Sequence, residues 1–142
     1  MTNRKADEYQ VGGDHYRKMA HQPQHLTRSY GLGGFEHSAI KYVSRWRNKG
    51  GIDDLRKALH FCEMLIENEN RFIQIGQPKG FDLPLTSNEY CSDNDLGDLE
   101  TIVVMCLCRW DRLLNPHYLK QAREAVLELI HVERMREKAD SD

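Results

Sequence analysis

The stretch FEHSAIKYVSRWRNKGGIDDLRKALHFCEMLIENENRF, residues 35–72, decides the fold of this chain. Apolar residues recur at spacings of three and four on both sides of Gly50-Gly51, which is the spacing of one buried helix face. Glycine stops a helix at its C-terminus, and Asp53 or Asp54 is a suitable N-terminal cap for the next helix. We therefore predict helices over about 35–48 and 53–72.

A second pair of helices is expected over about 96–114 and 118–138, where apolar residues keep the same period. A gap-free shift of 64 residues gives ten identities among the 39 positions from Leu32 to Asn70, and it places Arg45-Trp46 on Arg109-Trp110. A duplicated helical hairpin explains this match, and chance similarity of two amphipathic helix pairs is the alternative. Two hairpins can bury one core. We predict an all-α fold of four main helices, arranged as two duplicated hairpins, with an irregular N-terminal segment.

The chain of 142 residues suits one compact domain or two very small ones. Residues 1–8 are expected to be disordered, and residues 9–73 to form the domain that carries the chemistry. Residues 74–95 are expected to form an exposed acidic connection, because the stretch from Asp82 to Glu100 has six acidic residues and no basic one. Residues 96–138 are predicted to be a structural or assembly half, since Lys41 is matched there by Met105.

Composition limits the class of protein. The net charge of −2 gives no global basic field, so direct nucleic-acid binding is not expected. No apolar run approaches the length of a membrane span, and the charged start lacks the apolar stretch of a signal peptide. A cytoplasmic protein is therefore expected. The cysteines form no CxxC pair, which favours buried, reduced thiols at Cys62, Cys91, Cys106 and Cys108.

A row of polar and basic side chains follows one face of the first predicted helix. His37, Lys41 and Arg45 are four residues apart, Lys49 extends the charge, and Lys57 opens the next helix. From Glu36 to His60 there are six basic and three acidic residues. Such a row beside a glycine turn can hold phosphates, because arginine offers forked hydrogen bonds and lysine a point charge. The alternative is a solvated helix face whose cations interact with the helix dipole.

Two further features are candidates for a site. The run Gly12-Gly13-Asp14-His15-Tyr16 combines glycines that allow close approach to a ligand with three polar side chains, although a tight turn is the simpler interpretation. Glu36, Asp53 and Asp54 are weak candidates for metal ligands, and helix capping is the favoured interpretation of the two aspartates. Motifs of the forms GxxxxGK[ST], GxGxxG, GxSxG and HExxH are absent from the sequence.

Several motifs in order resemble a small phage protein family. They are GGDHY at 12–16, Gln22-Pro23, IKYVSRW at 40–46 and KGGIDDLRKA at 49–58. The SaV-like family that they resemble was formerly a domain of unknown function, and it includes a podovirus nucleotide kinase that has no P-loop. The resemblance covers about residues 9–67. One departure is His37-Ser38, where relatives often have Gly-Asn.

The resemblance implies a phage-encoded nucleotide-binding enzyme that transfers a phosphoryl group to deoxynucleoside monophosphates in the host cytoplasm. It implies that Asp14, His15, Lys41 and Arg45 are catalytic. It also implies a nucleoside triphosphate donor with Mg²⁺, and a site shared between subunits of a homo-oligomer. The nucleotide-binding positions that it implies are Gly12, Gly13, Tyr16, His37, Tyr42, Lys49, Gly50 and Lys57.

Two other functions stay open at this point. One is a nucleotide pyrophosphohydrolase similar to MazG-like proteins, with magnesium held by Glu36, Asp53, Asp54, Glu63 and Glu67, although the usual paired ExxE spacing is missing. The other is a phage protein that binds a host factor and inhibits or redirects it. Release of pyrophosphate distinguishes the first alternative from a kinase, and recovery of one stoichiometric host partner favours the second.

Overall fold

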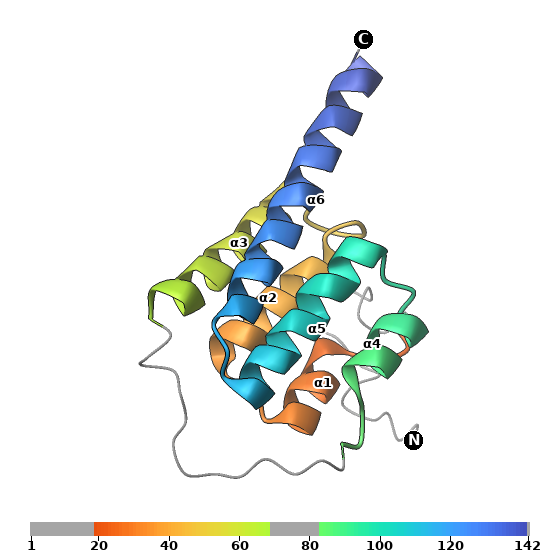
Figure 1. The fold of residues 1–142 in the computed structure, drawn as a ribbon. Coiled ribbons are helices and arrows are strands. Elements are labelled where there is room, and N and C mark those ends of the chain that lie inside the picture. The colour runs from red at the N-terminus through yellow and green to blue at the C-terminus, as the bar shows by residue number, and fades with distance from the viewer. Residues whose placement is uncertain (1–18, 69–82, 142) are drawn as a thin grey trace, which may run out of the picture.

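A computed structural model describes residues 19–68 and 83–141 of the chain. In these two ranges the secondary structure is helical, with no strand, so the prediction of an all-α protein is confirmed. Figure 1 shows how the helices are arranged. The helices are α1 (Pro23–Tyr30), α2 (Gly34–Arg45), α3 (Ile52–Glu67), α4 (Ser87–Asp93), α5 (Asp98–Leu113) and α6 (His117–Ser141).

The four long helices follow the apolar periodicity closely. Helix α2 begins one residue before its predicted start and ends three residues before its predicted end, and α3 begins one residue early. Both are amphipathic, with Ala39, Ile40 and Val43 of α2 packed into a core that they share with Leu55 and Leu65 of α3. Helices α5 and α6 pack against each other in the same way, and α3 lies against α6. The long helices therefore form one layered core.

Helices α1 and α4 lie in segments where we predicted no helix. Helix α1 falls in the segment expected to be irregular, and α4 falls in the expected exposed connection. Both are short, so their own periodicity is a weak signal, and tertiary contacts hold them. Tyr90 of α4 is fully buried, and its hydroxyl shares a 2.7 Å hydrogen bond with Ser44. At the start of α4, Thr86 and Glu89 cap each other reciprocally.

Equivalent features recur 64 residues apart. Helices α1 and α4 begin at 23 and 87, α2 and α5 at 34 and 98, and α3 and α6 at 52 and 117. Gly31 and Asp95 both have positive φ, and each precedes a residue whose N–H closes the end of the short helix. Helix α2 contacts α5, and α3 contacts α6. Each helix of one set thus meets its own counterpart, which is how elements meet across a twofold axis.

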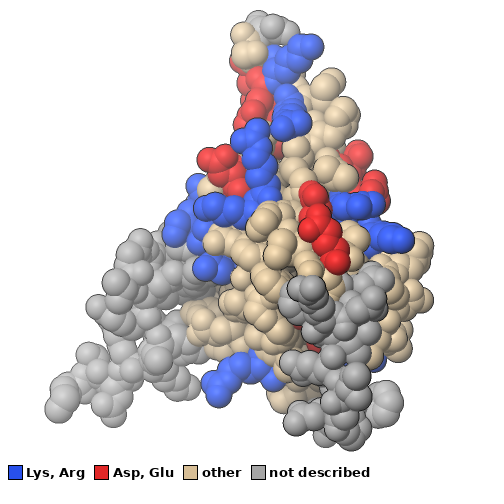
Figure 2. All heavy atoms as spheres, turned by 90° about the vertical axis from the view of Figure 1, so that its left-hand side faces the viewer, with Lys and Arg blue, Asp and Glu red and all other residues tan. Residues whose placement is uncertain are grey.

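Trp46 and Trp110 are both buried in the shared core, as the pattern favoured. The C-terminal part of α6 projects beyond this core (Figure 1). Lys and Arg side chains follow the projection on the face shown in Figure 2. In the ranges that the structure covers, none of the helices combines the length and apolarity that crossing a bilayer requires.

Candidate functional site

Three cations surround one aromatic ring at the contact between α2 and α3. The Nζ atoms of Lys41 and Lys57 each lie 5.3 Å from the centroid of the Tyr42 ring, and Cζ of Arg45 lies 4.7 Å from it. These distances are within the range of cation–π attraction. We call Lys41, Tyr42, Arg45 and Lys57 the Tyr42 cluster. The structure thus brings together four of the residues that the sequence nominated.

Two phenylalanines support the Tyr42 ring. Phe61 of α3 stacks on it with a centroid separation of 6.1 Å and an interplanar angle of 4°. Phe35 contacts Phe61 in turn, with centroids 5.9 Å apart. Such ring pairs contribute beyond their buried area, and they fix the ring that the cations surround. Sequence analysis did not nominate these residues, although the spacing of four between Lys57 and Phe61 places both on one face of α3.

Arg45 is held by a buried carboxylate. Its Nε donates to Oδ2 of Asp54 at 2.9 Å, and a terminal nitrogen donates to Oδ1 at 3.2 Å. The Asp54 side chain is 1% exposed and that of Arg45 is 11% exposed, so water screens the pair little. The Gly50 N–H also donates to Asp54, and a Cβ at Gly50 would lie 2.2 Å from that carboxyl group. Arg45 and Gly50 therefore hold Asp54, and Asp54 neutralises the guanidinium.

Lys41 and Lys57 differ from Arg45 in this respect. Among the residues that the structure describes, no carboxylate lies within ion-pair distance of either lysine. Lys57 is exposed and Lys41 is half-buried. Their two positive charges are therefore the part of the Tyr42 cluster that is left to attract an anion.

His37 lies one turn before Lys41 but makes its hydrogen bond elsewhere. Its Nδ1 shares a 2.6 Å hydrogen bond with the Thr27 hydroxyl of α1. Burial lowers the pKa of His37, and the nearby positive charge of Lys41 lowers that pKa further. The imidazole is therefore neutral at pH 7, and it ties α1 to α2.

This lowered pKa predicts how stability depends on pH. Between the lowered pKa in the folded protein and the ordinary value of 6.5, the unfolded chain binds more protons at this position, so stability rises with pH. The contribution is complete above about pH 6.5, the reference value for histidine, and is lost as the pH falls below it. Urea midpoints at pH 7.5 and 5.5 measure the difference. We expect a smaller difference in His37→Asn than in the wild type, and an unchanged one in the control His60→Asn. An unchanged difference in His37→Asn would contradict this assignment.

The candidate metal ligands have other roles. Glu36 is buried and accepts the Gly33 N–H at 3.0 Å, which caps α2. Asp53 is exposed and pairs with Arg56 at 3.3 Å. Within 19–68 and 83–141, no group of three His, Cys, Asp or Glu side chains is arranged to hold a metal ion. Capping and ion pairing therefore account for these carboxylates, as the favoured interpretation expected.

Other nominated residues lie apart from the cluster. Lys49 is exposed in the turn between α2 and α3. The run Gly12-Gly13-Asp14-His15-Tyr16 lies outside the described residues. The prediction of buried, reduced cysteines is confirmed for all four residues, and burial raises the pKa of Cys62 to about 12 and that of Cys91 to about 11. These thiols are therefore protonated at pH 7 and are poor nucleophiles.

Comparison of the chain with protein-family models, with curated proteins and with solved structures finds no match in any of the three.

Proposed function

We propose that the protein binds the phosphates of a nucleotide at the Tyr42 cluster. The observation that carries the proposal is the position of Lys41 and Lys57, which flank one ring and have no carboxylate partner among the described residues. Two ammonium groups close together repel each other, and a phosphate between them removes that repulsion and gains charge-assisted hydrogen bonds. The Tyr42 ring and the Arg45–Asp54 pair position the lysines and do not compete for the anion.

The reaction proposed for this site is phosphoryl transfer to a deoxynucleoside monophosphate, which is what the resemblance to the phage family implies. This chemistry needs in-line positioning and neutralisation of the transferring charge more than covalent help. Lys41 and Lys57 supply the neutralising charge, and Arg45 keeps them in place through Tyr42. Asp14 and His15 orient the acceptor in this proposal, with Gly12, Gly13 and Tyr16 beside them.

Magnesium fits this site only as part of the substrate. Asp54 is the carboxylate that joins the cluster, and its oxygens already accept hydrogen bonds from Arg45 and Gly50. We therefore propose that any Mg²⁺ arrives with the triphosphate donor, and we assign it no protein ligand.

We further infer that the two halves of the chain arose by duplication of one helical unit. The constant spacing between equivalent helix starts supports this, as does the contact of each long helix with its counterpart. In this proposal the first half carries the nucleotide site, and residues 96–138 serve assembly of a homo-oligomer in the cytoplasm of a phage-infected cell.

A panel of deoxynucleoside monophosphates tests the proposed reaction. Each is incubated with several nucleoside triphosphates, with and without magnesium, and the products are separated by chromatography. We expect a new diphosphate from at least one acceptor, and a rate at least about tenfold lower for Lys41→Ala, because one neutralising contact is lost. The exposed Lys138→Ala is the matched control and should keep full activity. Absence of any transfer, together with absence of nucleotide binding, would remove this function.

A further inference from the structure

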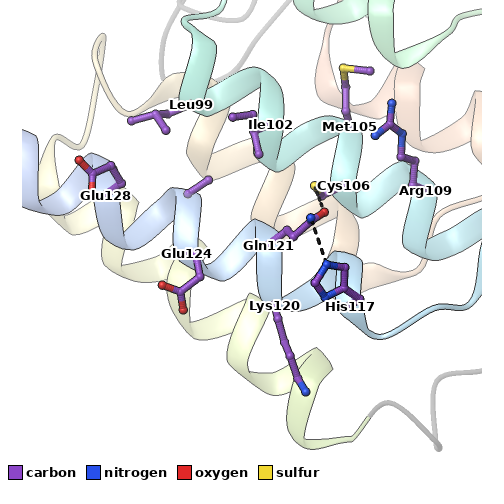
Figure 3. Close-up of a pocket in the computed structure, with 11 residues that line it drawn as sticks. Leu99, Ile102, Met105, Cys106, Arg109, His117, Lys120, Gln121, Glu124 and Glu128 are labelled. Carbon is purple, nitrogen blue, oxygen red and sulfur yellow. Dashed lines mark hydrogen bonds between the residues drawn. The ribbon is translucent and has the colours of Figure 1, made fainter.

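A groove of about 640 Å³ runs along the outer face of α5 and α6. Figure 3 shows its lining residues, with Leu99, Ile102 and Met105 on α5 facing the side chains of α6. Ile102 is 43% exposed, which is high for a large apolar side chain. This groove belongs to no part of the site described above.

The groove corresponds to a place that is filled in the first half of the chain. At positions 64 residues earlier, Phe35, Tyr42 and Phe61 form the aromatic contacts that cover α2 and α3. The second half has smaller side chains at the matched positions, so the same region is left open. Ile102 also replaces Ser38, and Met105 replaces Lys41, which makes the open region apolar. The three matched pairs are Phe35 with Leu99, Tyr42 with Cys106, and Phe61 with Ala125.

The two ends of the groove carry opposite charge. Because α5 and α6 are joined by a short connection and contact each other along their length, Arg109 and Lys120 lie at one end, beside His117 (Figure 3). Glu124 and Glu128 lie toward the other end (Figure 3). Glu124 is partly neutralised by Arg123 at 3.4 Å, so Glu128 carries the clearer negative charge.

From this pattern we propose that the groove is the interface for a second copy of the same chain. A twofold axis through the apolar middle places the basic end of one groove over the acidic end of the other, so the surface is complementary to itself. Ile102 and Met105 of each copy then cover the region that Tyr42 and Phe61 cover in the first half. This proposal names the interface of the homo-oligomer inferred above, and it needs no nucleotide.

Sedimentation of the full-length protein over a concentration series, with no nucleotide present, tests the interface. We expect a dimer in the wild type and a monomer in Ile102→Asp, because the variant places a charge in the apolar middle. Ile102 is exposed in the single chain, so the helical circular dichroism should not change. Leu113→Asp, at a side chain that is 63% exposed and outside the groove, is the control and should remain dimeric.

Charge reversal tests the twofold arrangement itself. Lys120→Glu and Glu128→Lys should each weaken the dimer at least about tenfold, since each places like charges opposite one another. The two changes together should restore the dimer, because the double variant is again complementary to itself. A wild type that is monomeric at all concentrations would overturn the proposal. A dimer unaffected by Ile102→Asp, or a double variant weaker than both single variants, would overturn it too. Nucleotide binding measured separately would fail only if the Tyr42 cluster is wrong, so the two proposals fail independently.

Discussion

Replacing Asp54 by alanine is expected to lower the free energy of unfolding by about 3–5 kcal/mol, the usual cost of removing one partner of a buried ion pair. The Asp54 carboxylate is 1% exposed and accepts two hydrogen bonds from Arg45 and one from the Gly50 N–H. Without it, the guanidinium of Arg45 stays largely buried with no counter-charge. The end of α2, the turn and the start of α3 all depend on this one group.

Chemical denaturation followed by circular dichroism measures the loss. The neighbouring Asp53→Ala is the matched control, because Asp53 is in the same helix turn but its side chain is 78% exposed in its pair with Arg56. We expect the control to change stability by less than about 1 kcal/mol, as exposed pairs do. If Asp54→Ala does not fold, Asp54→Asn keeps the shape and should show a smaller loss of the same sign. Equal effects at positions 53 and 54 would contradict the role given to Asp54.

Replacing Glu100 by alanine is the second large effect, with an expected loss of about 2–3 kcal/mol, because it leaves buried donors without an acceptor. Glu100 of α5 is buried, and it accepts the Trp46 indole N–H at 3.1 Å and the Arg47 Nε–H at 2.9 Å. These bonds join the end of α2 to the start of α5, so they tie the two halves of the chain together. Asp98→Ala, which removes an exposed carboxylate from the same helix turn, is the control.

A double-mutant cycle separates this contact from general destabilisation. Trp46→Phe removes the indole N–H and keeps most of the ring. If the hydrogen bond is the cause, Trp46→Phe costs less stability in the Glu100→Ala background than in the wild type. Identical costs in both backgrounds would show that the two residues act separately.

The long helices could be predicted from the sequence because the physical cause of their formation is local and periodic. Apolar residues at spacings of three and four, with glycines at 50–51, place α2 and α3 within a few residues of their observed bounds. Helices α1 and α4 could not be predicted in this way. Tyr90 is buried by residues far along the chain, and its hydroxyl bonds to Ser44, so α4 depends on tertiary contacts that a local pattern does not contain.

The candidate site was predictable only in part. The row of Lys41 and Arg45 follows from helical spacing, and the proximity of Lys57 follows from the glycine turn. The pairing of Arg45 with Asp54 depends on the angle at which α3 leaves that turn, which spacing alone does not give. The groove between α5 and α6 was harder still to predict, because it results from small side chains at positions whose counterparts are aromatic.

The central claim is that the lysines of the Tyr42 cluster bind nucleotide phosphate, and calorimetric titration tests it most directly. Deoxynucleoside mono- and triphosphates are titrated into the wild type, into the Lys41→Ala/Lys57→Ala double variant and into Lys138→Ala. We predict that at least one nucleotide binds the wild type and Lys138→Ala equally well. Its affinity for the double variant should be about a hundredfold lower, the effect of losing two charged contacts. Equal affinity for the wild type and the double variant, or no binding of any nucleotide to the wild type, would contradict the claim.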